Sequence, residues 1–143
     1  MADIEQAIRE YLVADAGVAA LVVARIYQGM APKSAGILDR ITFAQVSGED
    51  VQSTQGLAGL DIARFQFDCW SSGATTCRTL ADALRTALAG FRGTRSGIVV
   101  RACLSLDSGD FSFEEPYDAS QTGMFRFRKD YRIAYRYTPV NWA

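Results

Sequence analysis

The chain has 143 residues, of which 49% are hydrophobic and 22% charged, and its formal net charge is −1. Such a composition is typical of one globular domain with a core that needs no metal or disulfide staple, so we treat residues 1–143 as a single domain. The near-neutral charge argues against a general nucleic-acid binder, which would be visibly basic. The chain has no histidine, which removes the commonest general base and the commonest metal ligand.

The first predicted element is an amphipathic helix over residues 3–14, whose apolar positions recur at helical spacing. Asp3 suits its N-cap, and Gln6 three residues later would complete a capping box. Val18–Val23 extends or follows this helix, and Ile26–Tyr27 predicts a brief edge strand.

Two strands are predicted next, over residues 41–46 and 60–70, paired as an antiparallel hairpin. The second alternates Phe65, Phe67 and Cys69 on one face with polar residues on the other. Between the strands, residues 48–59 read as a long polar connection, longer than an ordinary hairpin loop.

A second helix is predicted over residues 75–91, a third strand over 98–106, a second long polar loop over 107–123 and a final strand over 125–137. The order is therefore α-β-β-α-β-β. It predicts an α+β fold: a small mixed, mostly antiparallel sheet with two main helices packed on one face.

The final strand carries aromatic residues and Ile133 on one face and mostly arginines on the other. The aromatic face belongs in the core. The arginine face allows three interpretations: a solvated surface paired to Asp68, Asp130 or Glu49 on the same chain, a protein interface, or a DNA contact. Base stacking is disfavoured because the aromatics lie opposite the arginines.

The sequence contains no catalytic motif that we would assign. The three cysteines are odd in number and form no C-x-x-C pair, which argues against a zinc cluster or a disulfide framework. Cys69 alternates with buried phenylalanines and predicts core packing. The acidic stretch from Asp107 to Glu115 leaves open a small enzyme using paired carboxylates, although an exposed acidic loop is the simpler interpretation. We expect a soluble chain that is not an enzyme and binds no cofactor or metal.

Three segments carry a resemblance to a known family. They are the helix-to-strand opening Leu12–Leu21 with Arg25–Tyr27, the strand Ala63-Arg-Phe-Gln-Phe-Asp-Cys-Trp70 followed by a helix, and the terminal Arg126–Tyr135. In this order and over nearly the whole chain, they resemble the tail-completion proteins of long-tailed bacteriophages and gene transfer agents, also called tail terminators or tail-to-head joining proteins.

The resemblance implies a structural assembly protein of the virion. Such proteins form a ring, typically a hexamer, that caps the head-proximal end of the tail tube and docks to the head connector. It implies the tail tube protein and the connector or stopper protein as partners, DNA passing through the lumen without sequence-specific binding, no membrane, and assembly in the bacterial cytoplasm. A neighbouring connector component such as a stopper is the alternative within phage assembly.

A closed ring needs two complementary surfaces on each subunit. The candidate interface residues are the arginines of the final strand and the acids of the preceding loop: Arg126, Arg128, Arg132, Arg136, Asp110, Glu114 and Glu115. The candidate contacts to tube or connector lie in the first long loop: Glu49, Asp50, Gln52 and Gln55.

Overall fold

A computed structural model describes residues 3–29, 39–53, 56–95, 97–106, 109–114 and 123–137, with the backbone alone for 49–53, 56–60, 114 and 137. The described helices are α1 (Ile4–Ala14), α2 (Ala16–Val22) and α3 (Ala74–Ala89). The described strands are β1 (Ile26–Gln28), β2 (Arg40–Ser53), β3 (Gly56–Ser71), β4 (Gly93–Arg95), β5 (Ile98–Ser105), β6 (Asp110–Glu114) and β7 (Met124–Tyr137).

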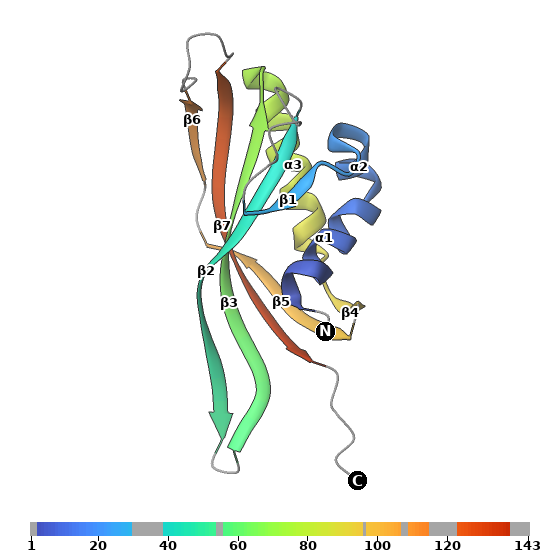
Figure 1. Cartoon of the computed structure of the whole chain (residues 1–143), viewed down its shortest axis with the longest axis vertical. Helices are drawn as coiled ribbons and strands as arrows, with labels where there is room; N and C mark the ends of the chain where they lie inside the picture. The colour runs from blue at the N-terminus through green and yellow to red at the C-terminus, as the bar shows by residue number, and fades with distance from the viewer. Residues whose placement is uncertain are drawn as a thin grey trace.

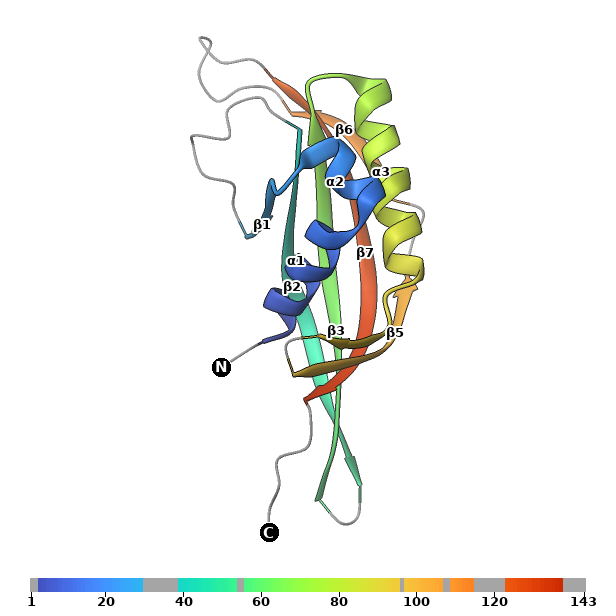
Figure 2. The same cartoon turned by 90° about the vertical axis from the view of Figure 1, so that its right-hand side faces the viewer.

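The molecule has two layers, with the helices on one face of a curved sheet (Figures 1 and 2). The sheet order is β1-β2-β3-β7-β5-β4, and β6 also pairs with β7. Only β1 and β2 are parallel among these pairs; the others are antiparallel. The predicted α+β class, the mostly antiparallel sheet and the helices on one face are confirmed.

The N-terminal helices form where the sequence supplies caps. The Asp3 carboxylate accepts from the Gln6 backbone N–H at 2.8 Å, and Asp15, which ends α1, accepts from Val18 N at 3.0 Å to begin α2. The predicted capping box is wrong in one half, because the Gln6 side chain donates to Glu10 Oε1 instead.

Two predicted loops were wrong. Residues 48–53 continue β2 and 56–59 continue β3, and β6 lies inside the predicted loop 107–123. Beyond Asp61, β3 pairs with β2 alone, so the end of this hairpin extends past the rest of the sheet (Figures 1 and 2). Residues 48–53 and 56–59 show no strict apolar alternation, so periodicity did not predict strands there.

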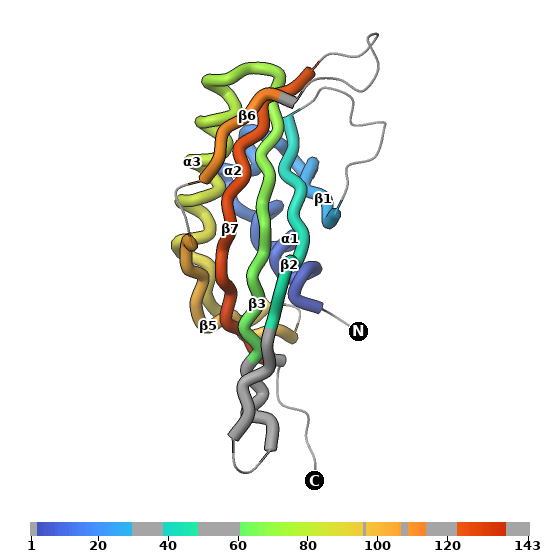
Figure 3. The backbone as a smooth tube through the Cα atoms, turned by 90° about the vertical axis from the view of Figure 1, so that its left-hand side faces the viewer, coloured from blue at the N-terminus to red at the C-terminus, as the bar shows by residue number. Residues whose placement is uncertain are grey.

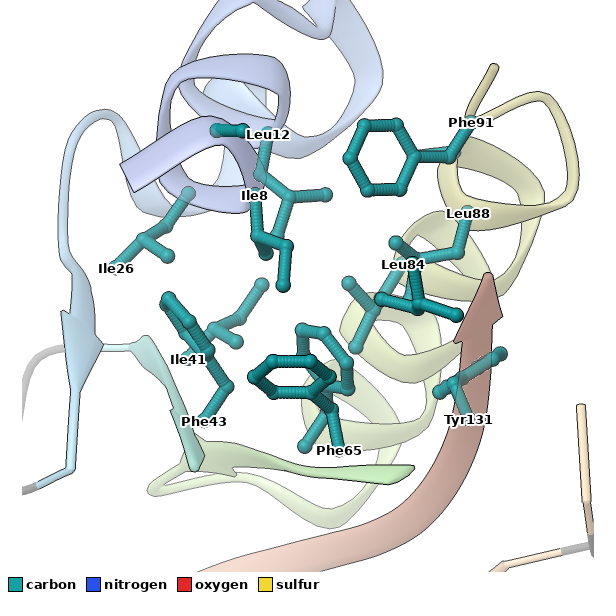
Figure 4. Packing of buried hydrophobic residues seen from close by; sticks show 14 of the residues in the cluster. Ile8, Leu12, Ile26, Ile41, Phe43, Phe65, Leu84, Leu88, Phe91 and Tyr131 are labelled. Carbon is teal, nitrogen blue, oxygen red and sulfur yellow. The ribbon is translucent and has the colours of Figure 1, made fainter. Parts of the chain in front are cut away.

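The core lies between the helices and the sheet. In Figure 4, Ile8 and Leu12 of α1 and Leu84 of α3 face Phe43 and Phe65 of the sheet, and all five side chains are buried. Helical spacing brings the α1 and α3 residues onto the sheet-facing side of each helix, and alternation does the same for the strands.

The aromatic face of β7 is buried only along part of its length. Tyr131, Ile133 and Tyr135 are buried, as predicted, and the Tyr131 ring meets Phe67 edge to face at 5.5 Å between centroids. Phe127 is half-buried and packs against the edge of the core.

Candidate assembly surface

The face of the sheet opposite the helices has no described element over it (Figure 3). We call it the open face. Register places the following described residues on it in cross-strand rows: Arg40, Thr42 and Ala44 of β2, Arg64, Gln66, Asp68 and Trp70 of β3, Asp110 and Ser112 of β6, and Arg126, Arg128, Asp130 and Arg132 of β7. Arginines outnumber aspartates among these described residues.

Asp68 is the centre of the open face. Its carboxylate accepts from Arg126 Nε at 3.0 Å and Nη2 at 3.2 Å, and from Arg128 Nε at 3.3 Å. The Gln66 amide adds a long contact of 3.5 Å. Asp68 is 8% exposed, so its charge depends on these partners for compensation. One carboxylate is therefore shared by two guanidinium groups.

Trp70 lies between two arginines in the next row. The Arg40 and Arg126 guanidinium carbons are 5.5 Å and 5.0 Å from the indole centroid, within cation–π range. The indole N–H donates to Thr42 Oγ1 at 3.0 Å. Partial burial lowers the pKa of Arg40 from its ordinary value, and nearby Tyr27 opposes that change. This row is a cationic and aromatic patch.

Further along the strands the arginines are more accessible. Arg64 pairs with Asp130, with Nη2–Oδ2 at 2.6 Å, and its side chain is 48% exposed. Arg132 is exposed. Arg136 is half-buried, and its Nε is buried without a hydrogen-bond partner among the described residues. Of the predicted interface arginines, Arg132 is therefore the most available to a neighbour.

The acidic candidates do not form a separate surface. Asp110 lies on β6 directly opposite Arg128, so an acid and a base expected on two different surfaces are adjacent on one. Glu114 is opposite Met124 on the same strand pair, and its side chain is outside the described residues, as is Glu115 entirely.

The predicted tube-contacting residues fall on the extended hairpin. Glu49, Asp50 and Gln52 lie within β2 and pair across to β3, so they are strand residues and were wrongly predicted as loop. Gln55 lies outside the described residues.

The sequence interpretation named Asp68 only as a partner of the arginines and missed Trp70 and Arg40 as parts of the surface. The signal was present for Trp70, because it continues the even-numbered polar face of Arg64, Gln66 and Asp68. Arg40 gave no such signal, because it joins the row only through pairing with β3.

The thiols lie apart from this face. Cys69 and Cys77 are buried and free, and Cys77 Sγ donates to the Cys69 carbonyl at 3.3 Å. Burial raises the pKa of Cys69 well above its ordinary value and that of Cys103 to about 12. The core position predicted for Cys69 is confirmed. Thiols of this kind are poor nucleophiles at neutral pH.

Among the described residues, no group of three His, Cys, Asp or Glu is placed to hold a metal ion. None of the helices in the described part is both long and apolar enough to cross a bilayer. The open face offers charged side chains and an aromatic ring on one side of the sheet, which are the chemistry of a contact surface.

Comparison with known proteins shows the family and a shared fold. The family model described as "Tail completion protein gp17" matches residues 6–136. A chain from a structure titled "Virion of native gene transfer agent (GTA) particle" shares the fold, with a TM-score of 0.69, 21% sequence identity, and coverage of 93% of this chain and 94% of that one. None of the proteins with curated descriptions matches.

The family match covers most of the chain and confirms the resemblance seen in the sequence. This chain belongs to the tail completion protein gp17 family, which is a family of structural proteins of phage tails.

Proposed function

We propose that this protein is a ring-forming subunit at the head-proximal end of a phage-like tail tube. We expect this ring to be a hexamer. It stops polymerisation of the tube and presents a surface to the head connector or stopper. The observation that carries the proposal is the family match over residues 6–136. The fold shared with a chain of a gene transfer agent particle supports it.

The extended β2–β3 hairpin supports a contact beyond the ring itself. Its end, from Gly56 to Leu60 of β3, pairs with β2 alone. A two-stranded ribbon by itself is marginally stable in water, so a partner that packs against it would add stability. We assign the tube or connector contact to this hairpin end, with Glu49, Asp50 and Gln52 on its β2 strand.

The open face is the second surface, and fewer of its arginines are available to a neighbouring subunit than the sequence indicated. Arg126 and Arg128 already bind Asp68 of the same chain, which favours the locally paired interpretation for these two. Arg132 remains as the proposed intersubunit arginine.

A deletion strain and microscopy test the proposed function. We expect rings of the purified protein in negative stain or by light scattering when tube protein is present, and tails of abnormal length in the deletion strain. Monomers under every condition together with normal tails would contradict the proposal. Localisation of the protein on the head side of the junction, away from the tube, would favour a stopper.

A shortened hairpin separates the two surfaces. Replacement of residues 51–60 by Asn-Gly would join Asp50 to its paired Asp61 through a two-residue turn. We expect this variant to form rings but to release tubes that do not join heads. A variant that completes tails normally would remove the hairpin end from the contact.

A further inference from the structure

The sheet has two open edges on opposite sides. On one side, β1 pairs only with Ile41–Phe43, which leaves the outer edge of β2 without a described strand from Ala44 onward. On the other side, β4 pairs only with Ile98–Val100, which leaves the outer edge of β5 without one at Ala102–Leu104. Open strand edges present unpaired backbone groups and are templates for pairing with another chain.

The two open edges lie at the same level of the sheet, which here means the same height along the strand direction. Across the strands, Ser47, Arg64, Arg132 and Leu104 form one row, and Glu49, Ile62, Ala134 and Ala102 form another. The part of β2 that β1 leaves open is therefore level with the part of β5 that β4 leaves open. In a ring generated by rotation alone, with the strands roughly along its axis, segments at one level face each other.

The strand directions are also compatible. The strands β2, β3, β7 and β5 alternate in direction across the sheet, since each adjacent pair is antiparallel. Because four strands alternate, β2 and β5 at the two sides run in opposite directions. In a ring, β2 of one copy would therefore be antiparallel to β5 of the next. Edge pairing would thus continue the antiparallel pattern from subunit to subunit.

Exposed apolar side chains lie at these edges. Val46, the extra residue of a bulge in β2, is 50% exposed, and its level falls between Leu104 and Ser105 of β5. Leu104 is 57% and Leu106 41% exposed. Single exposed apolar residues are ordinary, but here they occur on both edges at matching levels.

Charge is complementary at the next level. Arg101 is an extra, exposed residue of β5 between Val100 and Ala102, and it forms no salt bridge with a described residue. Its level lies between those of Asp50 and Glu49 on β2. Two acidic positions on one edge therefore correspond to one basic position on the other.

We propose that the outer edge of β2 in one copy pairs with the outer edge of β5 in a second copy of this chain. Val46 packs on Leu104 and Leu106, and Arg101 pairs with Glu49 or Asp50. The bulges turn Val46 and Arg101 out of the regular strand alternation, so these side chains are free to reach the neighbouring copy. This contact rests on the proposed ring and specifies the strand-edge part of its intersubunit surface, next to Arg132, which pairs with Leu104 in the sheet.

Complementary single-edge variants test the pairing. Leu104→Lys disables the β5 edge, and Val46→Lys disables the β2 edge. Each variant alone should lose ring formation, with self-association about tenfold or more weaker. An equimolar mixture should give a heterodimer and nothing larger, because only one competent edge of each kind remains. Thr86→Lys, at an exposed position of α3, is the matched control and should form normal rings.

Charge exchange gives a second test. Arg101→Glu should block assembly, as should Glu49→Arg with Asp50→Arg, whereas the triple variant should restore it. Circular dichroism of each monomer checks that the variants fold, and Arg85→Glu on α3 is the charge-matched control.

The outcomes distinguish this contact from the ring itself. If the Leu104→Lys, Val46→Lys and Arg101→Glu variants form rings as the wild type does, the edge pairing is overturned and the proposed ring is not. The edge pairing and the ring would both be overturned if the wild-type protein stayed monomeric with tube protein present and if the deletion strain made normal tails.

Discussion

The Asp68→Asn substitution is the sharpest test of the open face. It keeps the shape of the side chain but removes the charge that Arg126 and Arg128 share, and it turns one acceptor into a donor facing guanidinium N–H groups. The side chains of Asp68 and Arg126 are only 11% and 18% exposed, so their pair should contribute about 1.5–3 kcal/mol. Arg128 is 42% exposed, and its bond counts as a surface pair of less than about 1 kcal/mol.

We therefore expect Asp68→Asn to lower the free energy of unfolding by about 2–3 kcal/mol. The melting temperature should fall by about 6–9 °C for a domain of this size. Urea unfolding followed by circular dichroism measures the first quantity and a thermal scan the second, both on monomeric protein. Asp130→Asn is the matched control: its partner Arg64 is 48% exposed, so the cost should stay below about 1 kcal/mol.

A double-mutant cycle tests the assignment to Arg126. Arg126→Gln in the Asp68→Asn background should cost less than it does in the wild type, because the partner is already gone. An Asp68→Asn cost below about 0.5 kcal/mol, or additive costs for the two substitutions, would refute the argument that this pair stabilises the sheet.

Three further predictions concern the stability of the fold. Tyr11→Phe removes the hydrogen bond that the Tyr11 hydroxyl donates to the Ala87 carbonyl at 2.7 Å, and should cost about 1 kcal/mol in urea unfolding; an unchanged midpoint would contradict the bond. Val23→Gly should raise stability by about 1 kcal/mol, because a β-branched residue is held at φ 58°, and a destabilised variant would show that the strain is not there. Burial raises the pKa of Cys103 from 9.0 to about 12, so its folded thiol keeps a proton that the unfolded thiol loses; stability should be full below pH 9, fall as pH rises from 9 toward 12, and fall less steeply in Cys103→Ala.

The helices and central strands followed from local patterns. Helical periodicity in α1 and α3, and alternation in β3 and β7, each identify the apolar face of the element. This pattern predicts the element correctly where that face packs on a core. The predictions were wrong at the end of the β2–β3 hairpin and at β6. Residues 48–53 lack strict apolar alternation, whereas β6 alternates Phe111 and Phe113 with polar residues, a strand signal that the loop prediction overlooked.

Local sequence patterns were sufficient for the fold class, the family and the two-faced character of the final strand, because periodicity and short motifs are local properties of the chain. The folded structure was needed to show that Asp68 binds Arg126 and Arg128, some sixty positions away, and that Asp110 lies opposite Arg128. It alone brought the open edges of β2 and β5 to one level. Such relations depend on strand register over long sequence separations, which pairing in the folded sheet sets and which no local pattern encodes.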